Sequence, residues 1–470
     1  MRRNAFYLIG AQVLVAPLSV ITNVLVARYL GPSNFGYLYL ATTFATFGFL
    51  FVEAGQGAAL SGLVAARRQR CGELLGSTLA WRALLLLPVA AVLFTVVEVG
   101  GYPRQVVIAL ALMLVVCTFG TVSNACQDAL RGYERTDVGA VTFVAWKLLI
   151  ALITVPVLLI WHSLPALLLA QALCTAIGAA AMIALLRRVH IIRLQVCREA
   201  LRELLVSGTP FLLLSLVLAL QENVDAVYLS KLASSEAVGW QAAARRLIGL
   251  LVYPASALVA ALYPTLSRLR YEEPERYAST AASALRTTVL LAVPLACGCL
   301  LFSELGVQLF DNKGFAAIRA NLQLLAPYLL LVYVSMPLGS VLMSSGRQRA
   351  WVLLQLLCVV MSVLLDPWLV PLCQVRFGNG GLGACLSMVT AELLMVAGAV
   401  ALVPKQLFDR ALLRSGAIAV AGGGAMTLTA LLFRNITPWV TAPIAVAAYA
   451  SVLVLCGALS YTGLRQLLQR

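Results

Sequence analysis

The stretch ARYLGPSNFGYLYLA, residues 27–41, joins two long apolar runs through a short turn that contains Gly31 and Pro32. Apolar runs of about 20 residues, each long enough to cross a ~30 Å hydrocarbon layer as a helix, recur from one end of the chain to the other. Hydrophobic residues make up 61% of the 470 residues and charged residues only 11%, which is more apolar surface than a soluble domain can bury. The sequence therefore predicts an all-α polytopic membrane protein with about 14 transmembrane helices and no sizeable soluble domain.

Basic residues are concentrated in loops on alternate sides of the predicted helices. The formal net charge is +15, and clusters such as RRQR at 67–70, RGYER at 131–135 and GRQR at 346–349 fall on one side. Loops on the opposite side, such as FGNGG at 377–381, carry few basic residues. This positive-inside distribution predicts that the basic loops and both termini are cytoplasmic, and it argues against nucleic acid as a partner.

The sequence offers no pattern typical of a catalytic or metal centre. Its eleven cysteines include no C-x-x-C pair, and most lie inside apolar runs, which is typical of small buried side chains. His162 and His190 lie far apart, and neither H-E-x-x-H nor the phosphate-binding G-x-x-x-x-G-K-[ST] pattern occurs. We therefore expect no catalytic residue, no metal ion and no cofactor.

The longest connection divides the predicted helices into a group of about six and a group of about eight. The segment RRVHIIRLQVCREALRELL, residues 187–205, alternates basic and apolar residues and is predicted to lie along the inner membrane surface as an amphipathic linker. It separates an N-terminal lobe, residues 1–186, from a C-terminal lobe, residues 206–403. The last two helices and a cytoplasmic tail follow in residues 404–470.

An internal repeat indicates that the two lobes are built alike. At a separation of 203 residues, Arg28 matches Lys231 and Gly36 matches Gly239. Both hairpins start from the cytoplasmic side, so the two six-helix lobes are predicted to be parallel, pseudo-symmetric repeats. In transporters this arrangement places the substrate at the interface between the lobes.

Ionisable residues inside apolar runs are the candidate functional residues, because each one costs at least about 2.5–3.5 kcal/mol at the centre of a membrane helix. Arg82, Asp128 and Arg286 lie near the cytoplasmic ends of their helices, and we interpret them as anchors whose side chains reach the interface. The deeper residues are Glu53, Lys147, Glu222, Asp225, Arg245, Arg246, Asp366 and Glu392.

Two interpretations of the deeper residues remain open. Asp225 and Arg245 fall at the same depth, about 9 Å below the outer rim, and are predicted to meet as an ion pair. Arg246 points about 100° away from Arg245, so at least one of the two arginines is predicted to face something else. The cluster is either a salt-bridge network that pins two helices, or part of a wall that handles an anionic substrate or an ion. Glu392 is similarly either a group whose protonation drives transport or a helix–helix hydrogen bond.

Three segments carry a resemblance to a known family: ARYLGPSNFGYLYLA at 27–41, QDALRGYERTDVGA at 127–140, and NVDAVYLSKLASSEAVGWQAAARRLIGLLVYPASALVAALYPTLSR at 223–268. In these segments, and over essentially its whole length, the chain resembles the polysaccharide flippases of the O-antigen type. That family belongs to the multidrug/oligosaccharidyl-lipid/polysaccharide (MOP) exporter superfamily. Leu229 is followed here by Ser230 and the charged Lys231, where relatives have a leucine and a glycine.

The resemblance implies two six-helix lobes around a central, partly aqueous cavity, with the last two helices peripheral. It implies a flippase, and not an enzyme, that carries an undecaprenyl-diphosphate-linked oligosaccharide to the outer leaflet of the inner membrane by alternating access. The implied partners are this substrate, membrane lipids and the polysaccharide polymerase machinery. The resemblance implies that Arg28, Lys147, Arg245 and Arg246 bind the substrate, and it matches Asp225 to an aspartate of the family. From their depth in the membrane, we predict that Glu53, Glu222, Asp225 and Glu392 couple an ion or form salt bridges.

Three alternative functions compete with this interpretation. A multidrug or organic-cation exporter of the same superfamily favours acidic rather than basic cavity walls. A membrane glycosyltransferase or ligase needs a larger outer loop than the sequence provides. A non-transporting scaffold for glycan assembly leaves the charged residues inside the membrane without a purpose that offsets their cost.

Overall fold

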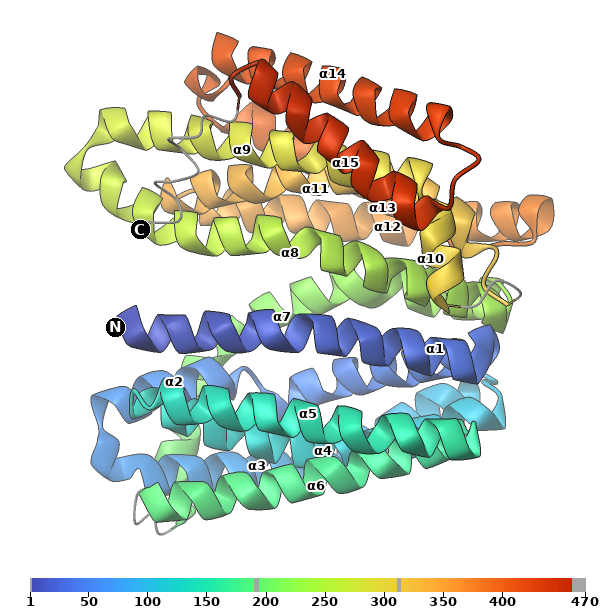
Figure 1. The fold of residues 1–470 in the computed structure, drawn as a ribbon. Coiled ribbons are helices and arrows are strands. Elements are labelled where there is room, and N and C mark those ends of the chain that lie inside the picture. The colour runs from blue at the N-terminus through green and yellow to red at the C-terminus, as the bar shows by residue number, and fades with distance from the viewer. Residues whose placement is uncertain (1, 190–193, 311–313, 459–470) are drawn as a thin grey trace. The chain divides into compact units, whose positions relative to one another are not determined.

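The computed structural model describes residues 2–189, 194–310 and 314–458. Within these ranges every regular element is a helix (Figure 1). Contacts divide the chain into two compact units, the N-terminal unit of residues 1–230 and the C-terminal unit of residues 231–470. The all-α membrane fold predicted from the sequence is confirmed.

Among its described residues, the N-terminal unit has seven α-helices, the last of which extends two residues past its boundary. They are α1 (Arg2–Glu53), α2 (Gln56–Ala66), α3 (Cys71–Val99), α4 (Arg104–Gly132), α5 (Thr136–Trp161), α6 (Leu164–Val189) and α7 (Arg198–Leu232). Helix α4 packs against α6 and α2 around a core of small and branched side chains that includes Leu60, Val64 and Leu130. The predicted linker over 187–205 includes residues 190–193, which lie outside the described residues, and the predicted lobe boundaries stay a prediction.

The C-terminal unit contains the remaining α-helices. They are α8 (Ser235–Glu272), α9 (Pro274–Leu301), α10 (Ser303–Phe310), α11 (Ile318–Ser344), α12 (Gln348–Phe377), α13 (Gly381–Leu402), α14 (Arg410–Leu432) and α15 (Pro438–Leu455). Helix α11 is central, because it packs against α8, α9 and α13. The last pair, α14 and α15, packs against α9 (Figure 1).

Thirteen helices in the described part of the chain are long and apolar enough to cross a membrane, and the first of these candidates supplies two crossings. That candidate covers Pro17–Ala66, 50 residues, about twice the length that one crossing needs. Gly31 interrupts α1 with a φ of +74°, a conformation that glycine adopts without steric cost. Pro32 lacks the backbone N–H that would continue the helix. The turn read from the sequence is therefore the bend between the first two crossings, which brings the number of crossings to about 14.

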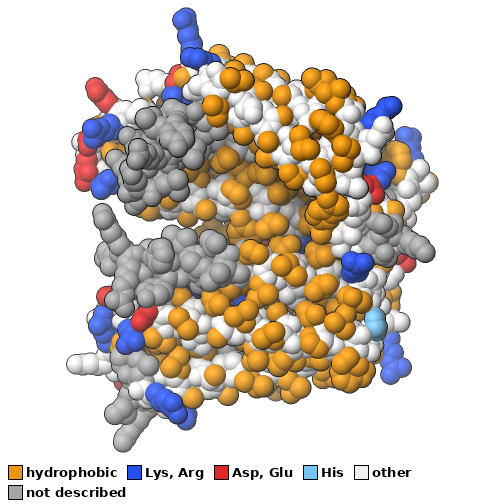
Figure 2. All heavy atoms as spheres, viewed as in Figure 1, with side chains coloured by type: hydrophobic (Ala, Val, Ile, Leu, Met, Phe, Trp, Pro, Cys, Tyr) orange, Lys and Arg blue, Asp and Glu red, His pale blue; other side chains and the backbone are white. Residues whose placement is uncertain are grey.

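The outer surface of each unit suits a hydrocarbon environment. Figure 2 shows hydrophobic side chains over most of the visible face of each unit, with the visible Lys and Arg side chains mainly toward the helix ends. Large apolar side chains in the middle of spans are strongly exposed, including Leu87 at 77% and Val420 at 70%. In water such a surface would aggregate, whereas in a bilayer it faces lipid chains.

Two tyrosines in the loops hold helix ends together. The Tyr133 hydroxyl, just after α4, donates a hydrogen bond of 3.1 Å to the backbone carbonyl of Arg68. Burial raises the pKa of Tyr133 to about 12, so its hydroxyl stays protonated at physiological pH. Tyr102, between α3 and α4, shares a hydrogen bond of 2.9 Å with Ser230 of α7, and burial raises its pKa as well.

The contact between α14 and α15 depends on the absence of a side chain at Gly422. A Cβ atom there would come within 2.6 Å of the Tyr449 ring, whose hydroxyl donates a hydrogen bond of 2.7 Å to the Leu290 carbonyl of α9. At Gly424, on the same helix, a Cβ atom would meet nothing within 4 Å. Small residues at such contacts are typical of helix packing in membranes.

We expect Gly422→Val to destabilise the protein by about 1–3 kcal/mol, because the new side chain overpacks the Tyr449 contact. Gly424→Val is the matched control and should change stability by less than about 0.5 kcal/mol. Thermal unfolding of the purified protein in detergent measures both. Equal losses in the two variants would show that helix propensity, and not packing against Tyr449, sets the effect.

Candidate functional site

A polar cavity of about 420 Å³ lies within the N-terminal unit. Helices α1, α4, α5 and α6 all contribute to its wall. Two of the residues selected from the sequence, Glu53 and Lys147, line this one cavity although they are far apart along the chain. The other polar side chains of the wall are Thr46, Cys117, Thr121, Asn124, Trp146, Gln171 and Thr175.

Lys147 is held against aromatic rings of its own helix. Its Nζ atom lies 5.1 Å from the centroid of the Trp146 ring and 5.8 Å from that of Phe143. The Trp146 ring in turn lies against Gly178 of α6, where a Cβ atom would come within 2.8 Å of it. Cation–π contacts of this kind stabilise a cation away from bulk water by about 0.5–2 kcal/mol.

Glu53, at the end of α1, is linked to a buried arginine through a threonine. The Thr121 hydroxyl donates a hydrogen bond of 3.0 Å to Glu53 Oε1. Arg82 Nη1 donates to the Thr121 carbonyl at 2.5 Å and to its hydroxyl at 2.8 Å, and lies 3.9 Å from Glu53 Oε1. These contacts join α1, α3 and α4 beside the cavity.

The sequence-based interpretation of Arg82 as an interfacial anchor is wrong. Arg82 is only 4% exposed, so its side chain turns inward and does not reach the membrane surface. The physical reason is the carboxylate of Glu53, since a buried guanidinium is stable only where polar partners and an opposite charge replace water. Depth along the helix was visible in the sequence, but the partner on α4 was not.

The second crossing is broken next to the cavity. Ala54 and Gly55 have φ values of +46° and +68°, and they separate α1 from α2 inside one candidate membrane span. Gln56, the first residue of α2, is fully buried, and neither of its amide atoms has a hydrogen-bond partner among the described residues. Discontinuous membrane helices occur where the backbone lines a cavity or is covered by protein. The sequence AGQG at 54–57, a polar residue between two glycines, was the available indication.

Helix α7 passes directly over this break. A Cβ atom at Gly55 would lie 2.2 Å from the carbonyl oxygen of Gly208, and a Cβ atom at Gly208 would lie 2.7 Å from that of Ala54. The two backbones therefore approach each other more closely than any residue with a side chain allows.

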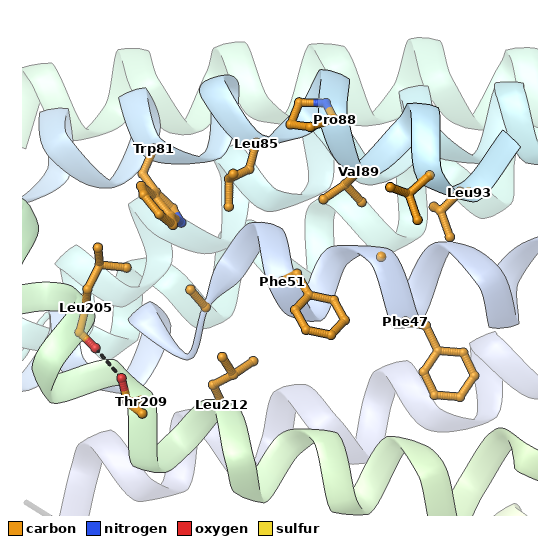
Figure 3. Close-up of a pocket in the computed structure, with 13 residues that line it drawn as sticks. Phe47, Phe51, Trp81, Leu85, Pro88, Val89, Leu93, Leu205, Thr209 and Leu212 are labelled. Atoms are coloured by element: carbon orange, nitrogen blue, oxygen red, sulfur yellow. Dashed lines mark hydrogen bonds between the residues drawn. The ribbon is translucent and has the colours of Figure 1, made fainter. Parts of the chain in front are cut away.

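A second, apolar pocket of about 580 Å³ lies on another face of α1. Figure 3 shows Phe47 and Phe51 of α1, Trp81 and Pro88 of α3, and Leu205 and Leu212 of α7 around it. The Thr209 hydroxyl donates to the Leu205 carbonyl of its own helix at 2.8 Å, so it adds little polarity (Figure 3). Residues 46, 49, 50 and 53 face the polar cavity whereas 47, 48, 51 and 54 face the apolar pocket, which follows helical periodicity.

The remaining predicted residues lie outside this cavity wall. Arg28 is exposed on α1 next to Tyr29, whose ring packs edge-on against His162 at 5.7 Å. On α7, Glu222 is exposed whereas Asp225 is only 2% exposed. Arg245 and Arg246 are adjacent and half-buried on α8 of the C-terminal unit.

Glu392 is the buried carboxyl of the C-terminal unit. It is 7% exposed on α13 and accepts a short hydrogen bond from the Ser335 hydroxyl of α11. Within the described part of the chain no basic side chain forms an ion pair with it. Both functions considered for it, ion coupling and helix joining, remain predictions.

Comparison with known proteins places this fold in a family. The sequence profile of the family described as "Polysaccharide biosynthesis protein" matches residues 1–270, more than half of the 470 residues. The chain belongs to this family. No curated protein sequence matches it significantly.

The solved structures with a similar fold include membrane transporters. The inward closed conformation of the lipid II flippase MurJ is 14% identical, with a TM-score of 0.77 over 97% of this chain and 98% of that chain. An inward-facing multidrug resistance MATE family transporter is 16% identical, with a TM-score of 0.66 over 86% and 94%. A MOP superfamily transporter from Pyrococcus furiosus is 14% identical, with a TM-score of 0.58 over 84% and 94%. The chain therefore shares the fold of these transporters, at sequence identities that show the fold alone.

Removing Arg82 should destabilise the protein through Glu53. We expect Arg82→Met to cost at most about 3 kcal/mol, because it leaves a partly buried carboxylate with only Thr121 as a partner. Adding Glu53→Gln to the same chain should restore much of that loss. Thermal unfolding in detergent measures the three variants.

The control is Arg286, whose Nη2 donates to Asp409 Oδ2 at 2.8 Å near the surface. Arg286→Met should cost less than about 1 kcal/mol. We call the linked contacts of Arg82, Thr121 and Glu53 the relay. If Arg82→Met lowers the unfolding free energy no more than Arg286→Met does, the relay contributes no stability.

Gly55 should tolerate no side chain. We expect Gly55→Ala to destabilise the N-terminal unit by about 1–3 kcal/mol, because a Cβ atom there both strains the backbone and meets the Gly208 carbonyl. Gly62→Ala, on α2 where a Cβ atom meets nothing within 4 Å, is the control and should be neutral or slightly stabilising. Unfolding midpoints compare the two, and an unchanged midpoint for Gly55→Ala contradicts the close approach.

Proposed function

We propose that the protein is a flippase that moves an undecaprenyl-diphosphate-linked oligosaccharide from the cytoplasmic to the outer leaflet of the inner membrane. Family membership and the fold shared with a lipid II flippase support this proposal. The observation that carries it is the polar cavity of about 420 Å³ inside membrane-spanning helices, with Glu53 and Lys147 in its wall. A cavity of this kind replaces water for a polar group that cannot enter hydrocarbon unaided.

The cargo needs two different environments at once. Its lipid chain is solvated by the hydrocarbon of the bilayer, whereas its diphosphate and sugars lose their hydration when they cross the membrane. Arg28, Arg245 and Arg246 are the candidates for offsetting the diphosphate charge, since a guanidinium binds phosphate oxygens through paired hydrogen bonds. Lys147 is a candidate for binding another polar part of the headgroup. Transport by alternating access breaks no bond, in keeping with a protein that is not an enzyme.

The carboxyls selected from the sequence are candidates for coupling to an ion. Glu53, Glu222, Asp225 and Glu392 differ in their surroundings, from the exposed Glu222 to the buried Asp225 and Glu392. In this proposal both termini are cytoplasmic, as the positive-inside distribution predicts, and the product is handed to the polysaccharide polymerase machinery.

An organic-cation exporter is the competing function within the superfamily. Glu53 in the cavity wall would favour it, but Lys147 in the same wall offsets that charge. The transport assay below separates the two functions.

Liposomes that contain the purified protein test the proposal with a fluorescent undecaprenyl-diphosphate oligosaccharide. We expect the wild type to make the lipid in the inner leaflet accessible to a modifying enzyme added outside. Arg245→Gln and Arg246→Gln should each slow this exchange about tenfold, which corresponds to a loss of about 1.4 kcal/mol of binding to the moving headgroup.

Arg349→Gln, an exposed arginine on α12, changes the net charge equally and should leave the rate unchanged. Loss of folded protein in the Arg245 and Arg246 variants would instead support a structural salt-bridge network. Exchange of an organic cation but not of the lipid would support the exporter.

A further inference from the structure

We propose that the polar cavity of the N-terminal unit binds an uncharged, hydroxyl-rich sugar ring of the transported lipid, and not its diphosphate. This inference rests on the proposed function and adds to it the part of the cargo that this cavity recognises. Four properties of the wall support it: its charge balance, its hydrogen-bonding groups, its aromatic surface and its size.

The charges in the wall are balanced. Among the described residues that line the cavity, Lys147 supplies one positive charge and Glu53 one negative charge. Arg82 lies behind Thr121, with which it shares two hydrogen bonds, and is not part of the wall. A diphosphate would need an excess of cations and an organic cation would need an excess of carboxylates. A neutral polar ligand fits a balanced wall best.

The hydrogen-bonding groups of the wall match hydroxyl groups, which both donate and accept. The side-chain amides of Asn124 on α4 and Gln171 on α6 each carry donors and an acceptor, and neither makes a side-chain hydrogen bond to another described residue. Thr46 and Thr175 donate to carbonyls of their own helices at 2.8 Å, so their oxygens face a ligand as acceptors. Helices α1, α4 and α6 together thus present donors and acceptors to one space.

Aromatic side chains supply an apolar surface within the same wall. Trp146 of α5 and Phe49 of α1 both line the cavity. The C–H groups of a sugar ring carry slight positive charge and pack against the negative face of an aromatic ring. Trp146 is fixed in place between Lys147 and Gly178, so its position costs no further ordering when a ligand binds.

The volume limits how much of the glycan enters. About 420 Å³ is at the small end of the range of ligand pockets, so the cavity holds a part of an oligosaccharide and not its whole length. Its polar side chains make this wall less suited to a lipid chain than the apolar pocket on the neighbouring face of α1. We infer that one part of the glycan is selected here while the lipid chain stays in a hydrocarbon environment.

Direct binding tests this inference on the full-length protein in nanodiscs. The probes are undecaprenyl diphosphate alone, undecaprenyl diphosphate carrying a short neutral oligosaccharide, and the same oligosaccharide free in solution. We expect the glycosylated lipid to bind at least tenfold more tightly than the bare lipid. Competition by the free oligosaccharide shows whether the sugar binds without its carrier.

Gln171→Leu and Asn124→Leu should each weaken binding of the glycosylated lipid about tenfold and leave binding of the bare lipid unchanged. Asn124→Gln, which keeps an amide, should retain most of the affinity. Thr209→Val in the apolar pocket is the matched control, because it removes a hydroxyl that bonds only to its own helix, and it should change neither affinity. Unfolding midpoints confirm that each variant is folded.

Two results overturn the inference and one overturns the proposed function. If the wild type binds bare and glycosylated lipid equally, or if the leucine variants weaken both lipids alike, the cavity does not recognise sugar, and the flippase proposal stands. If the wild type binds neither lipid, the flippase proposal itself fails.

Discussion

The carboxylate of Glu53 lies among membrane-spanning helices, where it is tolerated only because other polar groups take the place of water. Its partners come from two other helices, because Thr121 of α4 donates to it and Arg82 of α3 stands behind Thr121. Since breaking any one contact leaves a buried polar group unsatisfied, the relay fixes α1, α3 and α4 relative to one another. The polar cavity exists beside this relay, so its shape depends on the same contacts.

The end of α1 separates two unlike environments. Helical periodicity places Thr46, Phe49 and Glu53 toward the polar cavity and Phe47 and Phe51 toward the apolar pocket. Neither face alone suits the lipid-linked glycan that we propose as substrate, because its two ends have opposite solvation needs. The break at Ala54 and Gly55 directly follows Glu53 of the polar cavity, and Ala54 itself lines the apolar pocket, so a change in the backbone there would alter both walls together.

Hydropathy, charge placement and turn chemistry sufficed to predict the helices, since each crossing is a local property of about 20 residues. The bend at Gly31 could also be predicted from adjacent residues, since Gly31 and Pro32 together interrupt a helix. Glu53 and Lys147 were chosen because a buried charge is costly, and they share a cavity. Arg82 was misread because its partner Thr121 lies 39 positions away, on a different helix. Asn124 and Gln171 were missed because placing an uncharged amide in a membrane helix costs little free energy. Such a residue is equally well explained by a hydrogen bond between packed helices.

The internal repeat predicted from the sequence aligns the broken segment of the N-terminal unit with an unbroken segment of the C-terminal unit. At the separation of 203 residues, Glu53 corresponds to position 53 + 203 = 256, which is Ser256, and its hydroxyl donates to the Val252 carbonyl of its own helix. The broken segment AGQG at 54–57 corresponds to ALVA at 257–260, and there α8 continues unbroken from Ser235 to Glu272. Leucine does not readily adopt the left-handed conformation that Gly55 has, and valine brings no buried amide. These substitutions give a physical reason why α8 has no break at the position that corresponds to Gly55.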